Sequence, residues 1–104
     1  MLILKGDCGK SVVIDILMDK TNSICFVYHD YPLIYNSICL SSLEYSLNDL
    51  KECILDELKA SDNLHYDYII VYTNKKEECL KDFIEWLGSN SWCCFAGNII
   101  VTCK

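Results

Sequence analysis

Apolar residues follow two different patterns along this chain, and the patterns alternate. Residues 24–29 form a continuous apolar run, which is typical of a strand covered on both faces. Residues 2–5 predict a short buried strand, and residues 67–73 predict the clearest strand of the chain. The segments after these runs have apolar positions that recur every three or four residues, which is typical of helices. The alternation predicts the order βαβαβα, followed by a C-terminal strand or hairpin.

The predicted helices have recognisable ends. In the segments that start at Ser46 and Asn74, an acidic residue lies three positions later, at Asp49 and Glu77, so each pair can cap a first turn. Gly88 is expected to end the last helix. The first helix, residues 10–20, is expected to bury its apolar positions against the sheet, and these are Val12, Val13, Ile16 and Leu17.

Two segments leave alternatives open. Residues 30–45 contain Pro32 and short apolar stretches, and they predict a long connection with room for an extra turn of helix or a strand. Residues 92–103 contain two β-rich runs around Gly97-Asn98, which indicates a hairpin but leaves a single strand open. The whole chain, residues 1–104, is expected to be one α/β domain. Its three layers are a mostly parallel sheet of four to five strands with helices on both faces.

Composition narrows the classes of function. The 52% apolar content of these 104 residues argues against disorder. The net charge of −6 and the lack of arginine argue against direct nucleic-acid binding, which depends on basic residues displacing counterions. An acidic surface suits a basic protein partner. No apolar run is long enough to cross a bilayer, so no membrane contact is expected.

The eight cysteines are interpreted as reduced thiols of a cytoplasmic protein. Several lie inside apolar runs, as Cys25 and Cys39 do, where cysteine acts as a small core residue. The first residues do not resemble a secretory signal, because a charge follows at Lys5. Only Cys93 and Cys94 are close in sequence, and neighbours on a strand point to opposite faces, so zinc is not expected.

The segment Lys5-Gly6-Asp7-Cys8-Gly9-Lys10-Ser11 joins the first strand to the first helix, which is the context of a phosphate-binding loop. Glycines let backbone N–H groups approach phosphate oxygens, and the helix N-terminus adds a partial positive charge. Lys10 would reach the β- and γ-phosphates, and the Ser11 hydroxyl would hold Mg²⁺. The alternatives are an ordinary tight turn and, as a separate hypothesis, a reactive thiol at Cys8.

This spacing is similar to KGGxGK[ST], the deviant Walker A motif of the ParA/MinD partition ATPases, with Asp7 in place of the second glycine. Residues 66–71 resemble the family's YDYIIID strand, and Tyr72 stands where its aspartate would be. Asp30 falls where the family ends its second strand with an aspartate. The resemblance covers about 30 residues directly and the βαβαβ order more loosely.

The resemblance implies a set of roles. Lys5 would be the signature lysine that reaches across a homodimer to the partner's nucleotide. The residues implied in phosphate binding are Lys5, Gly6, Gly9, Lys10 and Ser11. Ser11 and Asp30 would contact Mg²⁺, and the implied cofactor is ATP or GTP with Mg²⁺.

Two departures from the family pattern weaken the expected activity. The Asp7 carboxylate would repel phosphates, and Tyr72 cannot replace a metal-binding carboxylate. We therefore expect a degenerate phosphate-loop domain with weak or vestigial nucleotide binding and poor hydrolysis, which leaves open whether the chain is an enzyme at all. The alternative is a small acidic interaction or inhibitor module of the mobile-element type, without catalysis.

Overall fold

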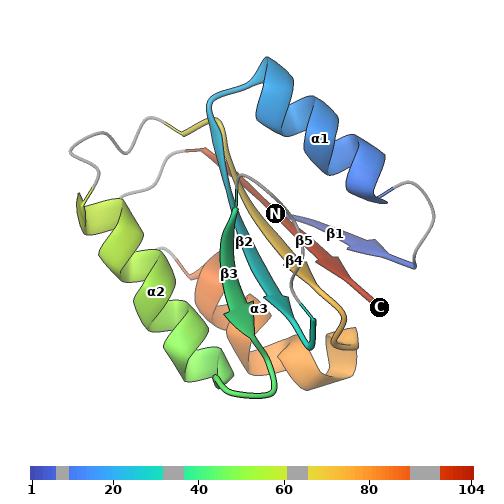
Figure 1. The fold of residues 1–104 in the computed structure, drawn as a ribbon, viewed down its shortest axis with the longest axis vertical. Coiled ribbons are helices and arrows are strands. Elements are labelled where there is room, and N and C mark those ends of the chain that lie inside the picture. Colours follow the sequence, from blue (N-terminus) through green and yellow to red (C-terminus); the bar gives the residue numbers. More distant parts are fainter. Residues whose placement is uncertain (7–9, 32–36, 61–65, 90–96) are drawn as a thin grey trace.

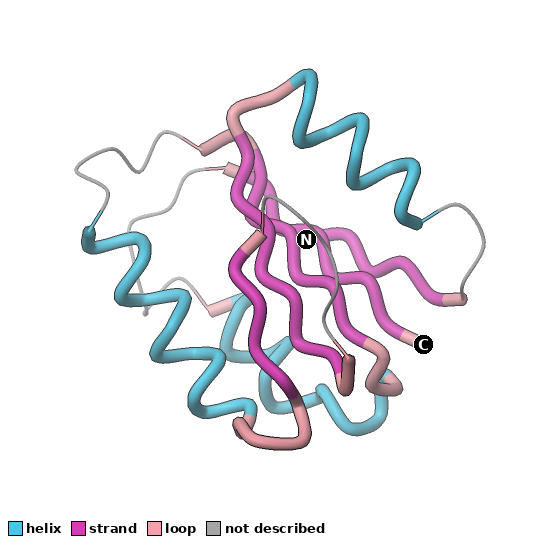
Figure 2. The backbone as a smooth tube through the Cα atoms, in the orientation of Figure 1, coloured by secondary structure: helices cyan, strands magenta, loops and turns pink. Residues whose placement is uncertain are grey.

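Five parallel strands form one sheet in the order β1-β5-β4-β2-β3 (Figures 1 and 2). The structure is a computed structural model that describes residues 1–6, 10–31, 37–60, 66–89 and 97–104 and, within these ranges, the side chains other than those of residues 10–13 and 60. The strands are β1 (Leu2–Lys5), β2 (Ser23–His29), β3 (Ile38–Ser41), β4 (Tyr68–Thr73) and β5 (Asn98–Cys103). The helices are α1 (Lys10–Lys20), α2 (Leu47–Ala60), the 3₁₀ helix η1 (Glu77–Leu80) and α3 (Lys81–Gly88).

The helices cover both faces of the sheet, as predicted. Helix α1 lies on one face, and α2 and α3 lie on the other (Figure 1). The connection from β1 to β2 crosses the sheet in the opposite direction to the connections from β3 to β4 and from β4 to β5. Right-handed crossovers in opposite directions place their helices on opposite faces, which explains the three layers.

Each face has its own apolar core. The core under α2 and α3 is the larger and contains Phe26, Tyr28, Leu50, Ile54, Leu58, Ile69, Val71, Phe83, Leu87 and Val101. The core under α1 contains Ile14, Cys25, Val27, Ile70 and Ile100. Strand β4 lies at the centre of the sheet and contributes to both, which explains why its sequence is a continuous apolar run.

Two of the open segments now have a structure. The predicted connection 30–45 contains β3, a short edge strand that pairs with β2. Strand β5 pairs in parallel with β1 on one side and β4 on the other, so residues 98–103 form one strand of a parallel sheet. The earlier part of the possible hairpin, residues 92–96, lies outside the described residues.

The predicted helix starts have different outcomes. The Ser46 pair is confirmed, because the Ser46 N–H donates to Oδ2 of Asp49 at 2.8 Å and the Asp49 N–H donates to the Ser46 hydroxyl at 3.3 Å. The Asn74 pair is wrong, because η1 has Lys76 at its N-cap and no side-chain cap hydrogen bond. Asn74 instead lies beside the end of β2, where it donates to Asp30.

Burial corrects two further expectations. Ile16 was expected to face inward but is 54% exposed, whereas Ile14 is buried. Leu17 packs against the core under α1, as expected, and the side chains of Val12 and Val13 lie outside the described ones. Strand β1 was expected to be buried, but it is an edge strand, and its Leu2 is exposed. No helix in the described ranges combines the length and the apolar content that a membrane crossing requires.

Candidate functional site

The carboxyl ends of all five strands lie at one edge of the sheet, which is where open α/β sheets bind ligands. Two groups of charged residues occupy this edge. We call the first the lysine hollow, and it is lined by Lys5, Lys76, Glu77, Glu78, Lys81 and Lys104. We call the second the Asp30 cluster, and it consists of Asp30, Ser42, Asn74 and Lys75.

The lysine hollow has a volume of about 470 Å³ and lies beyond the ends of β1 and β5. Its lysines come from four places in the fold. Lys5 ends β1, Lys104 follows β5, Lys76 precedes η1 and Lys81 begins α3. Among the described lining residues, four lysines against two glutamates give an excess of positive charge in a chain whose net charge is −6. This arrangement concentrates a positive potential where the rest of the surface is acidic.

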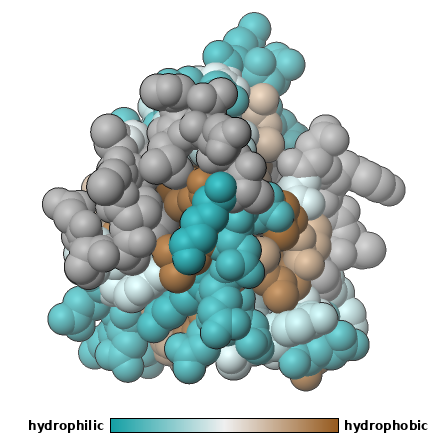
Figure 3. Space-filling model, turned by 90° about the vertical axis from the view of Figure 1, so that its left-hand side faces the viewer, coloured by the Kyte–Doolittle hydropathy of each residue, from teal (hydrophilic) through white to brown (hydrophobic). Residues whose placement is uncertain are grey.

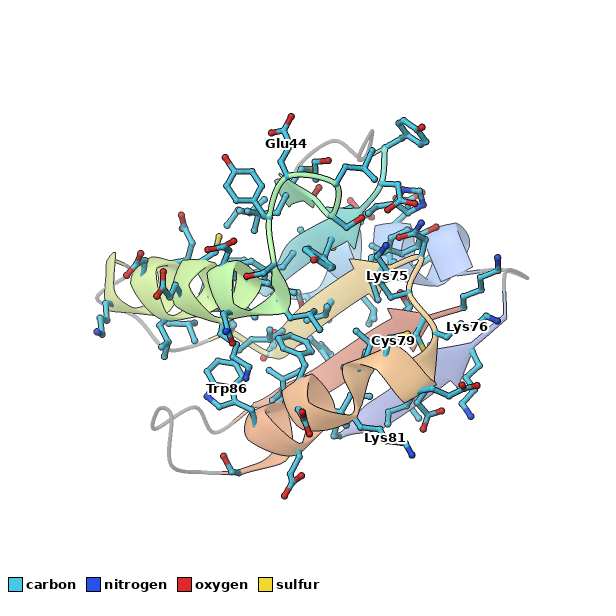
Figure 4. All side chains as sticks on the ribbon, turned by 90° about the horizontal axis from the view of Figure 1, so that it is seen from below. Glu44, Lys75, Lys76, Cys79, Lys81 and Trp86 are labelled. Atoms are coloured by element: carbon cyan, nitrogen blue, oxygen red, sulfur yellow. The ribbon has the colours of Figure 1, made fainter. Side chains whose placement is uncertain are left out.

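One ion pair crosses the hollow. The Lys5 ammonium contacts Oε2 of Glu77, a carboxylate oxygen that is shielded from solvent. The Lys5 side chain is 63% exposed, so a ligand in the hollow can contact its ammonium group. Lys76, Lys81 and Lys104 form no salt bridge within the described part of the chain. Figure 4 shows Lys76 beside the loop that follows β4 and Lys81 at the start of α3.

The turn after β1 begins at the hollow. Gly6 directly follows Lys5 and has φ +89°, in the left-handed region that favours glycine. A Cβ at Gly6 would meet nothing within 4 Å, so backbone conformation, and not crowding, favours glycine at this position. The positive φ turns the chain out of the strand and toward α1, which starts at Lys10.

The predicted phosphate-site residues therefore fall into three groups. Lys5 lines the hollow, and Gly6 adjoins it. Lys10 and Ser11 are the first residues of α1, as predicted, but the structure does not describe their side chains. Gly9 lies in the segment 7–9, outside the described residues, as does Cys8.

Asp30 is held by three donors. The Lys75 ammonium lies 3.0 Å from Oδ1 of Asp30, the Ser42 hydroxyl donates to the same oxygen, and Asn74 donates as well. The Ser42 hydrogen bond is the largest of the effects that lower the pKa of Asp30 from 3.8 to about 2, ahead of Lys75 and Asn74. The Ser42 backbone N–H also donates to the His29 carbonyl at 3.0 Å, which fixes the turn beside the carboxylate.

This geometry fits Mg²⁺ poorly. The carboxylate predicted to contact the ion is already bound by an ammonium group, and Asp30 does not line the lysine hollow. Within the described ranges there is no group of three or more histidine, cysteine or acidic residues that could hold a metal. The metal role of Ser11 stays a prediction, because its side chain is outside the description.

Tyr72, which stands where the partition ATPases have an aspartate, belongs to an aromatic pair. The ring of Tyr72 on β4 stacks with the ring of His29 on β2, with centroids 6.3 Å apart and planes at 22°. Tyr72 packs against the core on the α1 side of the sheet. Nδ1 of His29 accepts a hydrogen bond from the Tyr31 N–H at 2.9 Å. Neither Tyr72 nor His29 has a carboxylate that could bind a metal ion on the face of the sheet that α1 covers.

Two of the described thiols are poor nucleophiles. Burial, with a smaller contribution from Cys39, raises the pKa of Cys25 to about 12. Burial also raises the pKa of Cys53, and Glu57 and Asp56 add to that shift. A thiolate is the reactive form of cysteine, so neither residue suits nucleophilic chemistry at neutral pH.

Sequence reasoning missed most of the hollow. Lys75 and Lys76 lie two and three residues after the clearest strand of the chain, and Lys104 follows the last strand. Lysines that follow strands of a parallel sheet share one edge, and this signal was present in the sequence. The sequence does not show which strands are neighbours in the sheet. The approach of Lys104 to Lys5 could therefore not be predicted.

No protein-family model matches this chain, and searches among curated proteins and among solved structures found no match either. The resemblance to the partition ATPases therefore stays a prediction.

Proposed function

We propose that this chain binds a phosphate-bearing small molecule at the lysine hollow and the adjoining β1–α1 turn, with little or no hydrolysis. The observation that carries the proposal is the convergence of four lysines, from four separate places in the fold, on one hollow of an acidic chain. Lysine binds phosphate as a point charge, so several ammonium groups around one hollow suit a multiply charged phosphate ligand.

The adjoining turn adds backbone groups. The positive φ of Gly6 leads the chain from β1 into α1, an 11-residue helix whose first N–H groups have no partner in the helix itself. The N-terminus of a helix attracts anions through these donors and through the helix dipole. A nucleoside triphosphate is the ligand that the sequence resemblance implies.

Slow hydrolysis follows from the residues at the strand ends. Phosphoryl transfer depends on groups that neutralise developing charge and position the attacking water. The Asp30 carboxylate is engaged with Lys75, and Tyr72 stacks on His29, so neither offers a carboxylate to such a reaction. We therefore expect binding without efficient turnover.

Calorimetric titration with ATP and with GTP, each with Mg²⁺ and with a chelator, tests this proposal. We expect saturable binding with a dissociation constant in the micromolar to millimolar range, a rise in Tm, and at most slow release of phosphate. The variant Lys10→Ala is expected to weaken binding, because Lys10 begins the helix beside the turn. Lys20→Ala is the matched control, since Lys20 is the last residue of the same helix.

Two outcomes would contradict the proposal. The first is that neither nucleotide gives binding heat or a rise in Tm. The second is that Lys10→Ala and Lys20→Ala bind equally well, because binding would then not depend on the turn.

A second candidate function is docking to a basic protein partner. The turn between β3 and α2 exposes Leu43 and Tyr45 on either side of Glu44, and Leu43 is 66% exposed. Figure 3 shows the side of the molecule where α2 lies, with mainly hydrophilic atoms low on this face and apolar atoms between them and the grey segments. Apolar residues among acidic ones suit a partner with basic groups around an apolar contact.

Capture of partners from a native lysate tests this candidate. Wild-type bait is compared with Leu43→Ser/Tyr45→Ser bait, which keeps the net charge. Loss of one stoichiometric partner with the variant would support docking at this turn, and identical capture by both baits would contradict it.

A further inference from the structure

We infer that the lysine hollow recognises the phosphate chain of its ligand alone, so that a linear polyphosphate such as triphosphate binds as well as a complete nucleotide. The inference rests on the proposed function and narrows it to a class of ligand. It follows from the lining of the hollow, from the balance of its charges and from the competing carboxylate of Glu77.

The lining offers nothing to a nucleobase. Among the residues that the structure describes, the six that line the hollow all carry charged side chains, and none of them is aromatic or aliphatic. Sites that hold a base use apolar or aromatic walls, and base stacking on an aromatic side chain is a main source of affinity. The described aromatic pair, Tyr72 and His29, does not line the hollow. A base bound with its phosphates in this hollow would therefore gain little from its surroundings.

The charges favour several linked phosphates over one. Lys5, at the end of β1, and Lys81, at the start of α3, approach the hollow from different elements, and Lys76 and Lys104 lie at two further places. A chain of phosphates can contact several of these ammonium groups at once. A single phosphate contacts fewer of them, and its attraction to more distant lysines is screened by salt.

Glu77 raises the threshold for binding. Its carboxylate contacts the Lys5 ammonium, so a phosphate must replace that contact to use Lys5. For orthophosphate the exchange replaces one anionic partner by another and gains little. A polyphosphate gains contacts with the remaining lysines in the same step, and these contacts offset the cost of releasing Lys5 from Glu77.

Calorimetric titrations at one ionic strength distinguish recognition of the phosphate chain alone from recognition of the whole nucleotide. The probes are sodium triphosphate, pyrophosphate, orthophosphate, ATP and adenosine. We expect the dissociation constants of triphosphate and ATP to agree within about threefold, orthophosphate to bind at least tenfold more weakly, and adenosine to give no heat. ATP binding tenfold or more tightly than triphosphate would overturn the inference and leave the proposed function in place. Failure of every phosphate compound to bind would overturn both.

The variant Glu77→Gln tests the competition for Lys5 directly. It removes the competing charge and keeps the shape of the side chain, so triphosphate is expected to bind at least threefold more tightly. Glu85→Gln is the matched control, because Glu85 is an exposed residue of α3 that does not line the hollow. Equal affinities for Glu77→Gln and the wild type, with both folded by circular dichroism, would show that Glu77 does not compete and would overturn this part of the inference.

Discussion

Two lysine–carboxylate pairs lie at the same edge of the same sheet, and they differ in what surrounds them. Lys75 pairs with Asp30 beyond the ends of β2 and β4, and Lys5 pairs with Glu77 beyond the end of β1. Around the first pair, Ser42 and Asn74 also donate to the carboxylate. Around the second pair, three further lysines face the hollow.

The difference separates a structural ion pair from a binding site. At Asp30 one carboxylate receives three donors, so its charge is compensated by the protein itself. Among the described residues that line the lysine hollow, the cations outnumber the anions, so further negative charge from outside is attracted. The presence of an ion pair does not distinguish the two regions. The local balance of donors and acceptors does.

The largest expected effect comes from removing two lysines of the hollow. The double variant Lys5→Ala/Lys81→Ala is expected to weaken triphosphate binding at least tenfold in a calorimetric titration, because each lost ammonium removes a charge-assisted contact. The double variant Lys20→Ala/Lys59→Ala removes the same charge from exposed positions outside the hollow. Salt screens such distant charges, so its affinity is expected to change less than twofold. Equal losses in both variants would mean that only net charge matters.

The same comparison predicts that two lysine substitutions have unequal effects on the stability of the fold. Lys75→Met removes a partner of Asp30 and is expected to lower Tm, because the carboxylate then loses one of its three donors. Lys81→Met removes a lysine from an excess of lysines, so the free energy of unfolding is expected to stay within about 0.5 kcal/mol of the wild-type value. Thermal unfolding by circular dichroism without ligand measures both. A larger loss of stability in Lys81→Met than in Lys75→Met would contradict the interpretation of the Asp30 cluster as structural and of the lysine hollow as a binding site.

The order of the elements could be predicted from the sequence because each has a local signal. The continuous apolar run of β4 and the Ser46–Asp49 cap of α2 are both set by neighbouring residues, and both are confirmed. Asn74 and Glu77 have the same spacing as a cap, but Asn74 donates to Asp30, which is distant in sequence. A local pattern cannot show which tertiary partner competes for a side chain.

The site was harder to predict for the same reason. Lys5 was identified from its motif, but the other lysines of the hollow come from the residue before η1, the start of α3 and the residue after β5. They meet Lys5 because β5 lies between β1 and β4, and strand order depends on long-range pairing. Asp30 was correctly expected at the end of a strand, but its bond to Lys75 depends on the neighbouring positions of β2 and β4.

A smaller effect is expected from pH. The pKa of Asp30 is lower in the folded chain, about 2, than its ordinary value of 3.8. A lowered pKa contributes stability that is fully present above the unfolded value and is lost as the pH falls through the folded one. Between about pH 4 and pH 2, Asp30→Asn is therefore expected to lose less stability than the wild type in urea unfolding. Asp56→Asn, an exposed change on α2, is expected to follow the wild type.

The smallest expected effect compares two exposed thiols, one near each region. Cys79 is an exposed residue of η1 and lies close to the lysine hollow. Its N–H donates a hydrogen bond of 3.0 Å to the carbonyl of Lys76, which lines the hollow. Cys39 lies on the edge strand β3, where it pairs with Val27 of β2, the strand that Asp30 follows. Triphosphate bound to the lysines is expected to slow alkylation of Cys79 by iodoacetamide about twofold, because the ligand crowds η1 and adds negative charge that disfavours the thiolate. Peptide-level mass spectrometry measures the rates, and Cys39 is expected to react at an unchanged rate. Slowing of Cys39 with no change at Cys79 would place the ligand at the Asp30 cluster and would contradict the contrast between the two ion pairs.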